Sequence, residues 1–159
     1  MLFTGQAEIT IDAKQRLAVP SKFRARLPEP ADPETPTAWY CVPWPDGSIL
    51  RLYPGVTFEN QASLLDDSLT AGSDAAKIDT SLFGFAEHLE MDKNGRVRLP
   101  KWHLDLVEMP GEVIVVGARN RLEVHARAGW QANIKDRFRE MAALIEKTER
   151  TDRRRGDDA

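Results

Sequence analysis

One segment of the chain occurs twice, eighty residues apart. Residues 12–20 have the sequence Asp-Ala-Lys-Gln-Arg-Leu-Ala-Val-Pro, and residues 92–100 have Asp-Lys-Asn-Gly-Arg-Val-Arg-Leu-Pro. The apolar residues before each Asp also match, as Ile9 with Leu89, Ile11 with Met91 and Phe3 with Phe83. A duplicated motif indicates a duplicated structural unit, so we expect two copies of one small fold.

The repeated segment has the features of a hairpin turn. Asn94-Gly95 favours a tight turn because both residues tolerate positive φ. Asp12 and Asp92 can accept hydrogen bonds from backbone N–H groups one or two residues on, which closes the turn. The residues after each turn alternate between apolar and basic. We therefore expect the apolar ones to face a core and the arginines to face solvent or a ligand. The inward set is Leu17, Val19, Val97 and Leu99, and the outward set is Arg16, Arg96 and Arg98.

Each turn is followed by signals for a short helix and a second hairpin. Pro20 and Pro100 suit the first turn of a helix, which predicts helices over 21–27 and 101–107. Turn residues between β-branched runs then predict paired strands at 38–42 with 49–53 and at 113–116 with 121–125. Each copy is therefore predicted as ββαββ, which is too small to be stable alone, and we expect the two copies to close one shared barrel.

The remaining segments are predicted as helices and a loop. The mostly acidic connector favours two helices separated at 71–73, and Asp74 is expected to cap the second. Each helix has an apolar stripe that we expect to pack in the core; the first stripe is Phe58, Ala62, Leu65 and Leu69, and the second is Ile78, Leu82 and Phe85. Residues 28–37 contain four prolines and three acids, which is typical of an exposed loop. A long helix is expected after Gly129, with an apolar stripe that covers the barrel or binds a neighbouring subunit; the stripe is Trp130, Ile134, Phe138, Met141 and Ile145. The charged tail from 148 to 159 is expected to fray.

Composition fits one compact domain. The 159 residues are 42% apolar and 30% charged, which suffices for one core but is short for two independent ones. The single cysteine, Cys41, excludes an intrachain disulfide, and no signal segment opens the chain, so we expect a cytoplasmic protein. The longest apolar stretch is far too short to span a membrane, so no membrane partner is expected.

The basic residues are unevenly distributed although the net charge is −3. Residues 12–26 contain five basic side chains and one acid, and residues 92–101 contain four and one. Two equivalent turns with basic surroundings indicate two related positive patches, as expected for binding a phosphate backbone. The alternative is that these side chains only solvate exposed strands and helices. In the repeated segment, the arginine is the one shared residue to which no structural role is assigned.

These residues together resemble the MraZ family over roughly residues 1–140. The resemblance is carried by Phe3-Thr4-Gly5, the paired Asp-x-x-x-Arg-x-x-x-Pro segments, Leu52-Tyr53-Pro54, Val116-Gly117 and the stretch 120–124. It implies an α+β, mainly β protein with two tandem SpoVT-AbrB repeats at 6–56 and 86–129 that form a pseudo-symmetric swapped-hairpin (double-psi-like) barrel. A helical connector at 57–85 and a C-terminal helix and charged tail at 130–159 complete this expected organisation.

The resemblance also implies a function. The family comprises bacterial transcriptional regulators that assemble into ring-shaped homo-oligomers and bind short direct repeats of double-stranded DNA in the promoter of their own division and cell wall operon. They act usually as repressors, which places the expected protein on the nucleoid. By similarity Arg16 and Arg96 contact DNA, and basic neighbours would hold phosphates, namely Lys14, Lys22, Lys93, Arg98 and Lys101. No cofactor, metal or small-molecule substrate is expected.

The sequence departs from the family pattern in three places. Gln15 occupies the usual glycine position of the first turn, and positive φ there would cost about 1 kcal/mol and give a shifted or stiffer turn. His125 stands where the family commonly has tryptophan, and the loop at 28–37 is longer than usual.

Enzymatic function has little support in the sequence. His88, His103 and His125 lie in separate elements without metal-ligand spacing, and Cys41 lies in an apolar strand, so no nucleophile and base pair is evident. The repeated acids Asp12 and Asp92 suggest a paired-carboxylate hydrolase, but turn closure explains them. We therefore expect no enzyme, with Trp44 and Trp102 as core or loop anchors. A ring-forming assembly module without DNA activity remains the alternative.

Overall fold

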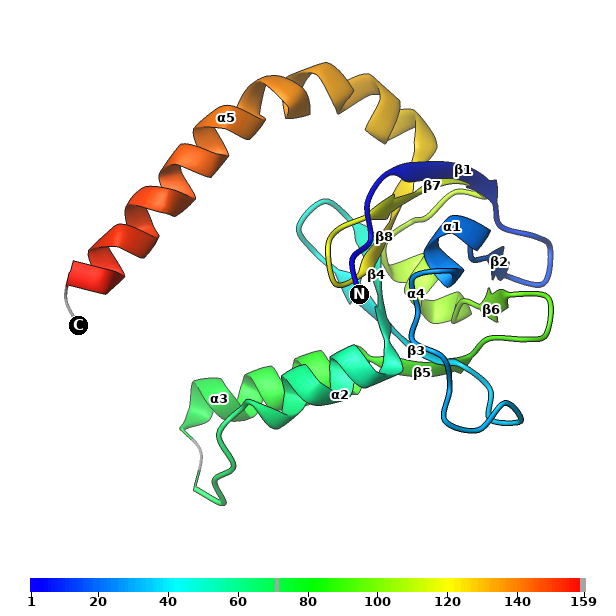
Figure 1. Cartoon of the computed structure of the whole chain (residues 1–159), viewed down its shortest axis with the longest axis horizontal. Coiled ribbons are helices and arrows are strands. Elements are labelled where there is room, and N and C mark those ends of the chain that lie inside the picture. Colours follow the sequence, from blue (N-terminus) through cyan, green and yellow to red (C-terminus); the bar gives the residue numbers. More distant parts are fainter. Residues whose placement is uncertain (71, 158–159) are drawn as a thin grey trace. The chain divides into compact units, whose positions relative to one another are not determined.

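A computed structural model describes residues 1–70 and 72–157 (Figure 1). The chain divides into two compact units, Met1–Arg127 and Ala128–Ala159. In chain order the elements are β1 (Gln6–Thr10), β2 (Arg16–Ala18), α1 (Ser21–Arg24), β3 (Ala38–Trp44), β4 (Ile49–Pro54), α2 (Gly55–Ser63), α3 (Ser73–Ile78), the π-helical turn η1 (Asp79–Phe83), β5 (Glu87–Glu90), β6 (Arg96–Arg98), α4 (Lys101–Leu106), β7 (Glu112–Gly117), β8 (Leu122–Ala126) and α5 (Arg127–Asp157).

The predicted strand and helix order is confirmed in both copies. The order strand, strand, short helix, strand, strand occurs as β1-β2-α1-β3-β4 and again as β5-β6-α4-β7-β8. The second hairpin of each copy forms as expected, with β3 antiparallel to β4 and β7 antiparallel to β8. Both copies lie within the first compact unit, so they form one body.

The predicted pairing of the first two strands within each copy is wrong. β1 pairs with β7 of the second copy, β5 pairs with β3 of the first, and β2 pairs with β6. In the first turn, the last backbone hydrogen bond runs from the Asp12 N–H to the Arg16 carbonyl, at 3.1 Å. Beyond this bond the two strands pair with different partners. Because β2 has only three residues, it could not have formed a stable hairpin on its own. The two copies therefore exchange strands.

The predicted closed barrel is wrong. The structure has a six-stranded antiparallel sheet of order β1-β7-β8-β4-β3-β5 and a separate two-stranded β2-β6 ladder. Within residues 1–70 and 72–157, no ladder joins the edge strands β1 and β5. Apolar residues of β2, β6 and α1 instead complete the core, since Leu17, Val97 and Phe23 belong to the same buried cluster as Trp39 and Val113 of the large sheet.

The copies are related by an approximate two-fold axis. Leu17 and Val97 occupy equivalent positions in the repeated segment and lie directly opposite each other in the β2-β6 ladder. Arg51 and Glu123 form the middle pair of the β4-β8 ladder. An axis through these two pairs exchanges one copy with the other, so the turns before β2 and β6 are also exchanged.

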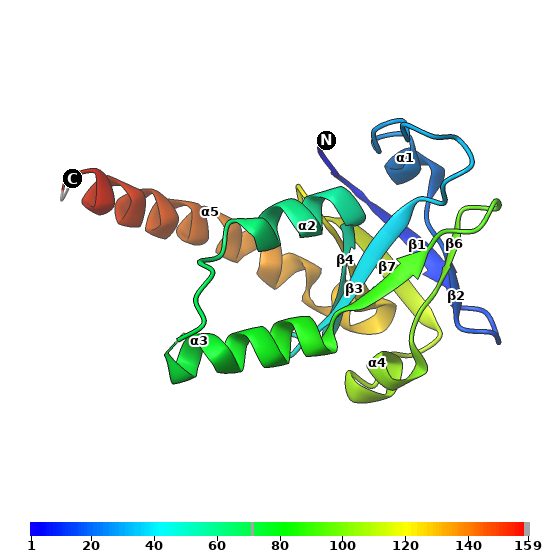
Figure 2. The same ribbon diagram turned by 90° about the horizontal axis from the view of Figure 1, so that it is seen from below.

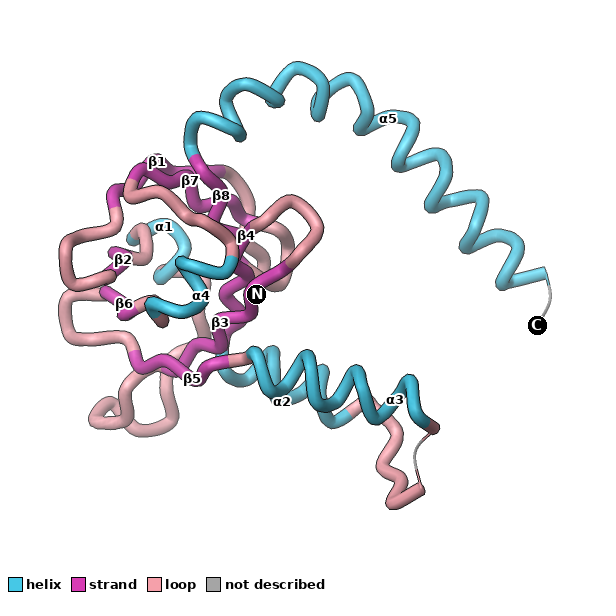
Figure 3. Tube along the Cα trace, turned by 180° about the vertical axis from the view of Figure 1, so that it is seen from behind, coloured by secondary structure: helices cyan, strands magenta, loops and turns pink. Residues whose placement is uncertain are grey.

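The connector is helical, but its predicted packing in the core is wrong. Leu65 is 47% exposed, and Leu69, Ile78 and Phe85 are also exposed. Figures 2 and 3 show α2 and α3 projecting from the sheet, so most of their apolar residues have no sheet to cover. The periodicity identified amphipathic helices, but it did not identify what lies against them.

The predicted helix ends also need correction. α3 begins at Ser73 with Gly72 in the N-cap position, so Asp74 lies in the first turn and makes no capping hydrogen bond. α5 begins at Arg127, ahead of Gly129, and remains helical to Asp157, through most of the tail expected to fray. Residues 71 and 158–159 of the predicted break and tail lie outside the described residues. The stretch 28–37 contains neither helix nor strand, as predicted.

Among the described residues, every helix is too short or too polar to span a membrane.

Candidate nucleic-acid interface

Each repeated Asp closes its turn. Asp12 Oδ1 accepts hydrogen bonds from the N–H groups of Lys14 and Arg16, both at 2.9 Å. Asp92 Oδ1 accepts the equivalent bonds from Asn94 and Arg96, also at 2.9 Å. The backbone N–H of the arginine in each turn holds the pKa of the Asp carboxyl below its usual value, so both turns carry an ionised carboxylate at neutral pH.

The same carboxylates also hold the arginines. Arg16 Nε donates to Asp12 Oδ2 at 2.7 Å, and Arg96 Nε donates to Asp92 Oδ2 at 3.0 Å. The interpretation that these arginines lack a structural role was therefore wrong. Their side chains remain 28% and 31% exposed, and within the described residues the Nη groups have no hydrogen-bond partner. Each guanidinium is thus fixed at one edge and presents its other donors outward.

The two turns have the same backbone form. Gln15 has φ 60° and Gly95 has φ 75°, so each turn needs a left-handed residue at this position. The Gln15 carbonyl accepts a hydrogen bond from Leu99 N–H, and the Gly95 carbonyl accepts one from Val19 N–H, both at 2.8 Å. The expectation that Gln15 shifts the first turn is wrong, because strand contacts from the other copy fix both turns equally.

Exchanging the residue types at these positions should change stability in opposite directions. A left-handed conformation costs about 1 kcal/mol for a residue with a Cβ, and Gln15→Gly relieves this cost. Glycine also raises the entropy of the unfolded chain, which offsets part of the gain, so we expect stabilisation of about 0.5 kcal/mol. Gly95→Ala should destabilise by about 1–2 kcal/mol, because its Cβ would also lie 2.7 Å from Arg24 Nε. Urea unfolding measures both, and equal effects of the same sign would contradict this account.

The β2-β6 ladder gathers arginines on one face. Arg16 lies opposite Arg98, and Arg96 lies opposite Ala18, while the central Leu17–Val97 pair is fully buried. Because side chains alternate along a strand, the three arginines share the outward face of the ladder. Lys14 and Lys93 are exposed in the turns that precede the two strands, and both turns lie at the same end of the unit (Figures 1 and 2).

Two of the predicted phosphate contacts lie outside both this ladder and the turns before it. Lys22 on α1 donates from Nζ to the carbonyl of Gln6 at 2.5 Å, so its ammonium faces β1 and does not join the arginines. Lys101 is exposed at the first position of α4, three residues beyond Arg98.

Arg24 was missed in the sequence. Its Nε donates to the carbonyl of Val19 at 2.9 Å, and its side chain lies against Gly95 in the second turn. The equivalent residue of the second copy is Leu104, so a comparison of the copies did not single out this arginine. Its position four residues after Pro20, on a short helix, was the available signal.

The histidines and the cysteine have structural partners. His103 is fully buried, with Nε2 2.6 Å from the Phe85 carbonyl oxygen and Nδ1 3.3 Å from Cys41 Sγ. Burial lowers the pKa of His103 and raises the pKa of the Cys41 thiol, so both groups are neutral at pH 7. His125 Nε2 lies 3.0 Å from a Glu123 carboxylate oxygen.

The repeated acids and two of the tryptophans also have structural partners. In the part of the chain that the structure describes, no group of three His, Cys, Asp or Glu side chains could hold a metal ion. Asp12 and Asp92 are each paired with their own arginine. Trp44 stacks on the Arg51 guanidinium at 3.7 Å, and Trp102 donates to Glu87 at 3.1 Å, which fits anchoring roles.

The fold and these turns define a class of small, internally duplicated proteins in which two ββαββ units exchange strands and present a pair of Asp-held arginines. A family model described as "MraZ protein, putative antitoxin-like" matches residues 82–155. A protein of Neisseria meningitidis serogroup C named "Transcriptional regulator MraZ" is 36% identical over 137 residues, which cover 84% of this chain and 85% of that protein. The chain belongs to the MraZ family.

Other bacteria have similar proteins with the same name. The one from Thiobacillus denitrificans is 32% identical over 145 residues, which cover 84% of this chain and 86% of that protein. The one from Lactiplantibacillus plantarum is 29% identical over 130 residues, with coverage of 82% and 86%. The similarity therefore extends over most of each relative and is not confined to one repeat.

Proposed function

We propose that this chain is a sequence-specific DNA-binding transcriptional regulator. The observation that carries the proposal is the outward face of the β2-β6 ladder, where Arg16, Arg96 and Arg98 lie together and two of them are held by Asp carboxylates. The names of the relatives support the same function. The protein would then act in the cytoplasm, bound to the nucleoid, and not as an enzyme.

The geometry divides the contacts with DNA into two kinds. The outward Nη groups of Arg16 and Arg96 suit bidentate hydrogen bonds to guanine O6 and N7 in the major groove. The remaining exposed cations near the turns suit phosphate oxygens, which fix the position of the protein without selecting bases; they are Lys14, Lys93, Arg98 and Lys101. Lys22 contributes less in this proposal, because its ammonium already binds a backbone carbonyl.

The target follows from the family resemblance. We propose short direct repeats in the promoter of the protein's own division and cell wall operon, with repression as the outcome. Two equivalent turns related by an approximate two-fold axis offer two similar contacts per chain, which is a small surface for specific binding. Several subunits that bind several repeats at once would raise the affinity, so a ring-shaped homo-oligomer suits this target.

A titration of promoter DNA at several salt concentrations tests the proposal. Each neutralised phosphate contributes about −0.9 to the slope of log K against log salt, so four contacts predict a slope of roughly −3 to −4 per bound chain. Fluorescence anisotropy with labelled promoter DNA measures this slope, and scrambled DNA of equal length is the control. A flat plot, or equal affinity for both DNAs, would contradict the proposed function.

The alternative function is an assembly module without DNA activity. The exposed apolar residues of α5 favour it, because they suit self-association without any DNA. Size-exclusion chromatography of the purified protein distinguishes the two functions through the ratio of absorbance at 260 and 280 nm. An assembly that carries no nucleic acid at low salt and ignores promoter DNA would favour the alternative.

A further inference from the structure

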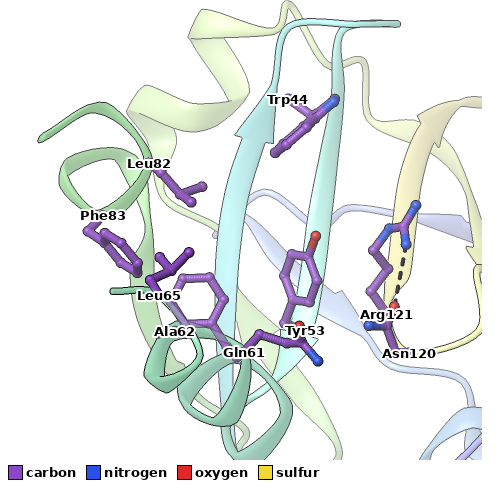
Figure 4. Close-up of a pocket in the computed structure, with 10 residues that line it drawn as sticks. Trp44, Tyr53, Gln61, Ala62, Leu65, Leu82, Phe83, Asn120 and Arg121 are labelled. Atoms are coloured by element: carbon purple, nitrogen blue, oxygen red, sulfur yellow. Dashed lines mark hydrogen bonds between the residues drawn. The ribbon is translucent and has the colours of Figure 1, made fainter. Parts of the chain in front are cut away.

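An apolar groove runs along the connector in the first compact unit (Figure 4). We call it the connector groove; it has a volume of about 280 Å³ and is lined by Trp44, Tyr53, Phe58, Gln61, Ala62, Leu65, Leu82, Phe83, Asn120 and Arg121. α2 and η1 supply one wall, and β3, β4 and the turn before β8 supply the other. The groove therefore lies where the projecting connector meets the sheet.

The groove has an aromatic floor and a neutralised rim. Phe58 packs on Tyr53 and Phe83, with ring centroids 5.6 and 5.9 Å apart. At the rim, Arg121 is bound to Glu123 at 2.9 Å, so its charge is compensated. Leu65 is 47% exposed at this site. Such a groove suits the apolar side chains of an amphipathic helix.

The second compact unit presents a helix face of this kind. α5 carries an exposed row of apolar residues, which we call the α5 stripe: Ile134, Phe138, Met141 and Ile145, between 41% and 73% exposed. Their spacing of four, three and four residues places them on one side of the helix over about 16 Å. An exposed apolar row of this length on a water-soluble helix marks an interaction site.

The charges of the two surfaces are complementary. α5 contains nine basic and six acidic residues, whereas the connector at 57–85 contains five acidic residues and one lysine. Lys135 and Arg137 flank the α5 stripe, and Glu59 and Asp66 lie beside groove residues in the sequence. Complementary potentials favour a helix-in-groove contact over pairing of two like-charged α5 helices.

We propose that the α5 stripe of one copy binds in the connector groove of a second copy. The two surfaces differ, so the contact is head-to-tail, and each subunit keeps one unused stripe or groove until a ring closes or a filament extends. This inference deepens the self-association in the proposed function by naming both of its surfaces. It does not depend on DNA.

Two variants that each remove one surface test the contact. Phe138→Asp places a charge in the stripe, and Leu65→Asp places one in the groove; both residues are exposed, so the fold of each subunit should persist. We expect the wild type to elute as a large assembly and each variant to elute as a monomer. An equimolar mixture should give a heterodimer and nothing larger, because it has one intact stripe and one intact groove. Light scattering after size-exclusion chromatography measures the masses.

Matched controls lie next to each change. Ala143→Asp adds the same charge on the opposite side of α5, and Leu64→Asp adds it beside the groove at a residue that does not line it. Both controls should assemble like the wild type. Full assembly by Leu65→Asp, a mixture that stays monomeric, or a monomeric wild type would each overturn the inference. None of these results measures DNA binding, so the proposed function fails or stands separately.

Discussion

Replacement of Arg16 by alanine is expected to lower the affinity for promoter DNA at least a hundredfold while the fold remains intact. A bidentate contact from arginine to guanine contributes about 1–3 kcal/mol of discrimination, and every subunit on the DNA loses it. The turn should persist, because the backbone N–H of residue 16 still donates to Asp12 after the change. Anisotropy titrations measure the affinity, and circular dichroism and urea unfolding check the fold.

Arg16→Lys is the matched control for this variant. Lysine keeps the positive charge but loses the planar fork that reads guanine, so specific affinity should fall and affinity for scrambled DNA should change little. Arg96→Ala should behave like Arg16→Ala, since the Asp-held geometry of the two turns is the same within 0.3 Å. A well-folded Arg16→Ala protein with undiminished promoter affinity would show that the ladder face does not read DNA.

Phe138→Asp is expected to lower the affinity for DNA with several repeats by about 10²–10⁴, although the changed residue contacts no DNA in the proposed complex. Joined subunits bind the second and later repeats intramolecularly, and this gain disappears when the assembly falls apart. Affinity for a duplex with a single repeat should stay the same, because the arginines are untouched.

A series of duplexes with one, two and three repeats measures this difference. The wild type should bind more tightly with each added repeat, and the Phe138→Asp variant should not. Ala143→Asp should follow the wild type. Loss of affinity for the single repeat in Phe138→Asp would contradict the prediction, because it would mean that the change damages the DNA-binding face itself.

The duplication and the local structure could be predicted from the sequence. Residue spacing located both turns, and alternation placed Leu17 and Val97 in the core, because these features depend on neighbours in the chain. The resemblance identified the family that the comparisons then confirmed. The turn chemistry also indicated that Gln15 would need positive φ, as it does.

Partners distant in the sequence could not be predicted. Nothing local indicates that β1 binds β7 instead of β2, because both alternatives satisfy the same alternation. The helical stripes of the connector looked like core residues, but Leu65 and Ile78 are exposed, since periodicity does not say what covers a face. Arg24 reaches the second turn from another element and has no counterpart in the second copy. Contacts between the copies, such as the one from Arg24 to the second turn, therefore lie at positions that a comparison of the two repeat sequences does not single out.

The exchange of first strands has a consequence for protein synthesis. β1 pairs with β7 across more than a hundred residues, from Gln6 to Val116, and the first turn is held by Leu99. A nascent chain that has completed only the first repeat therefore has an unpaired β1 and a first turn without its anchor. Contacts this distant form late and slow folding. The first turn therefore gains its anchor only after the second repeat has left the ribosome as far as Leu99, so both turns become competent together.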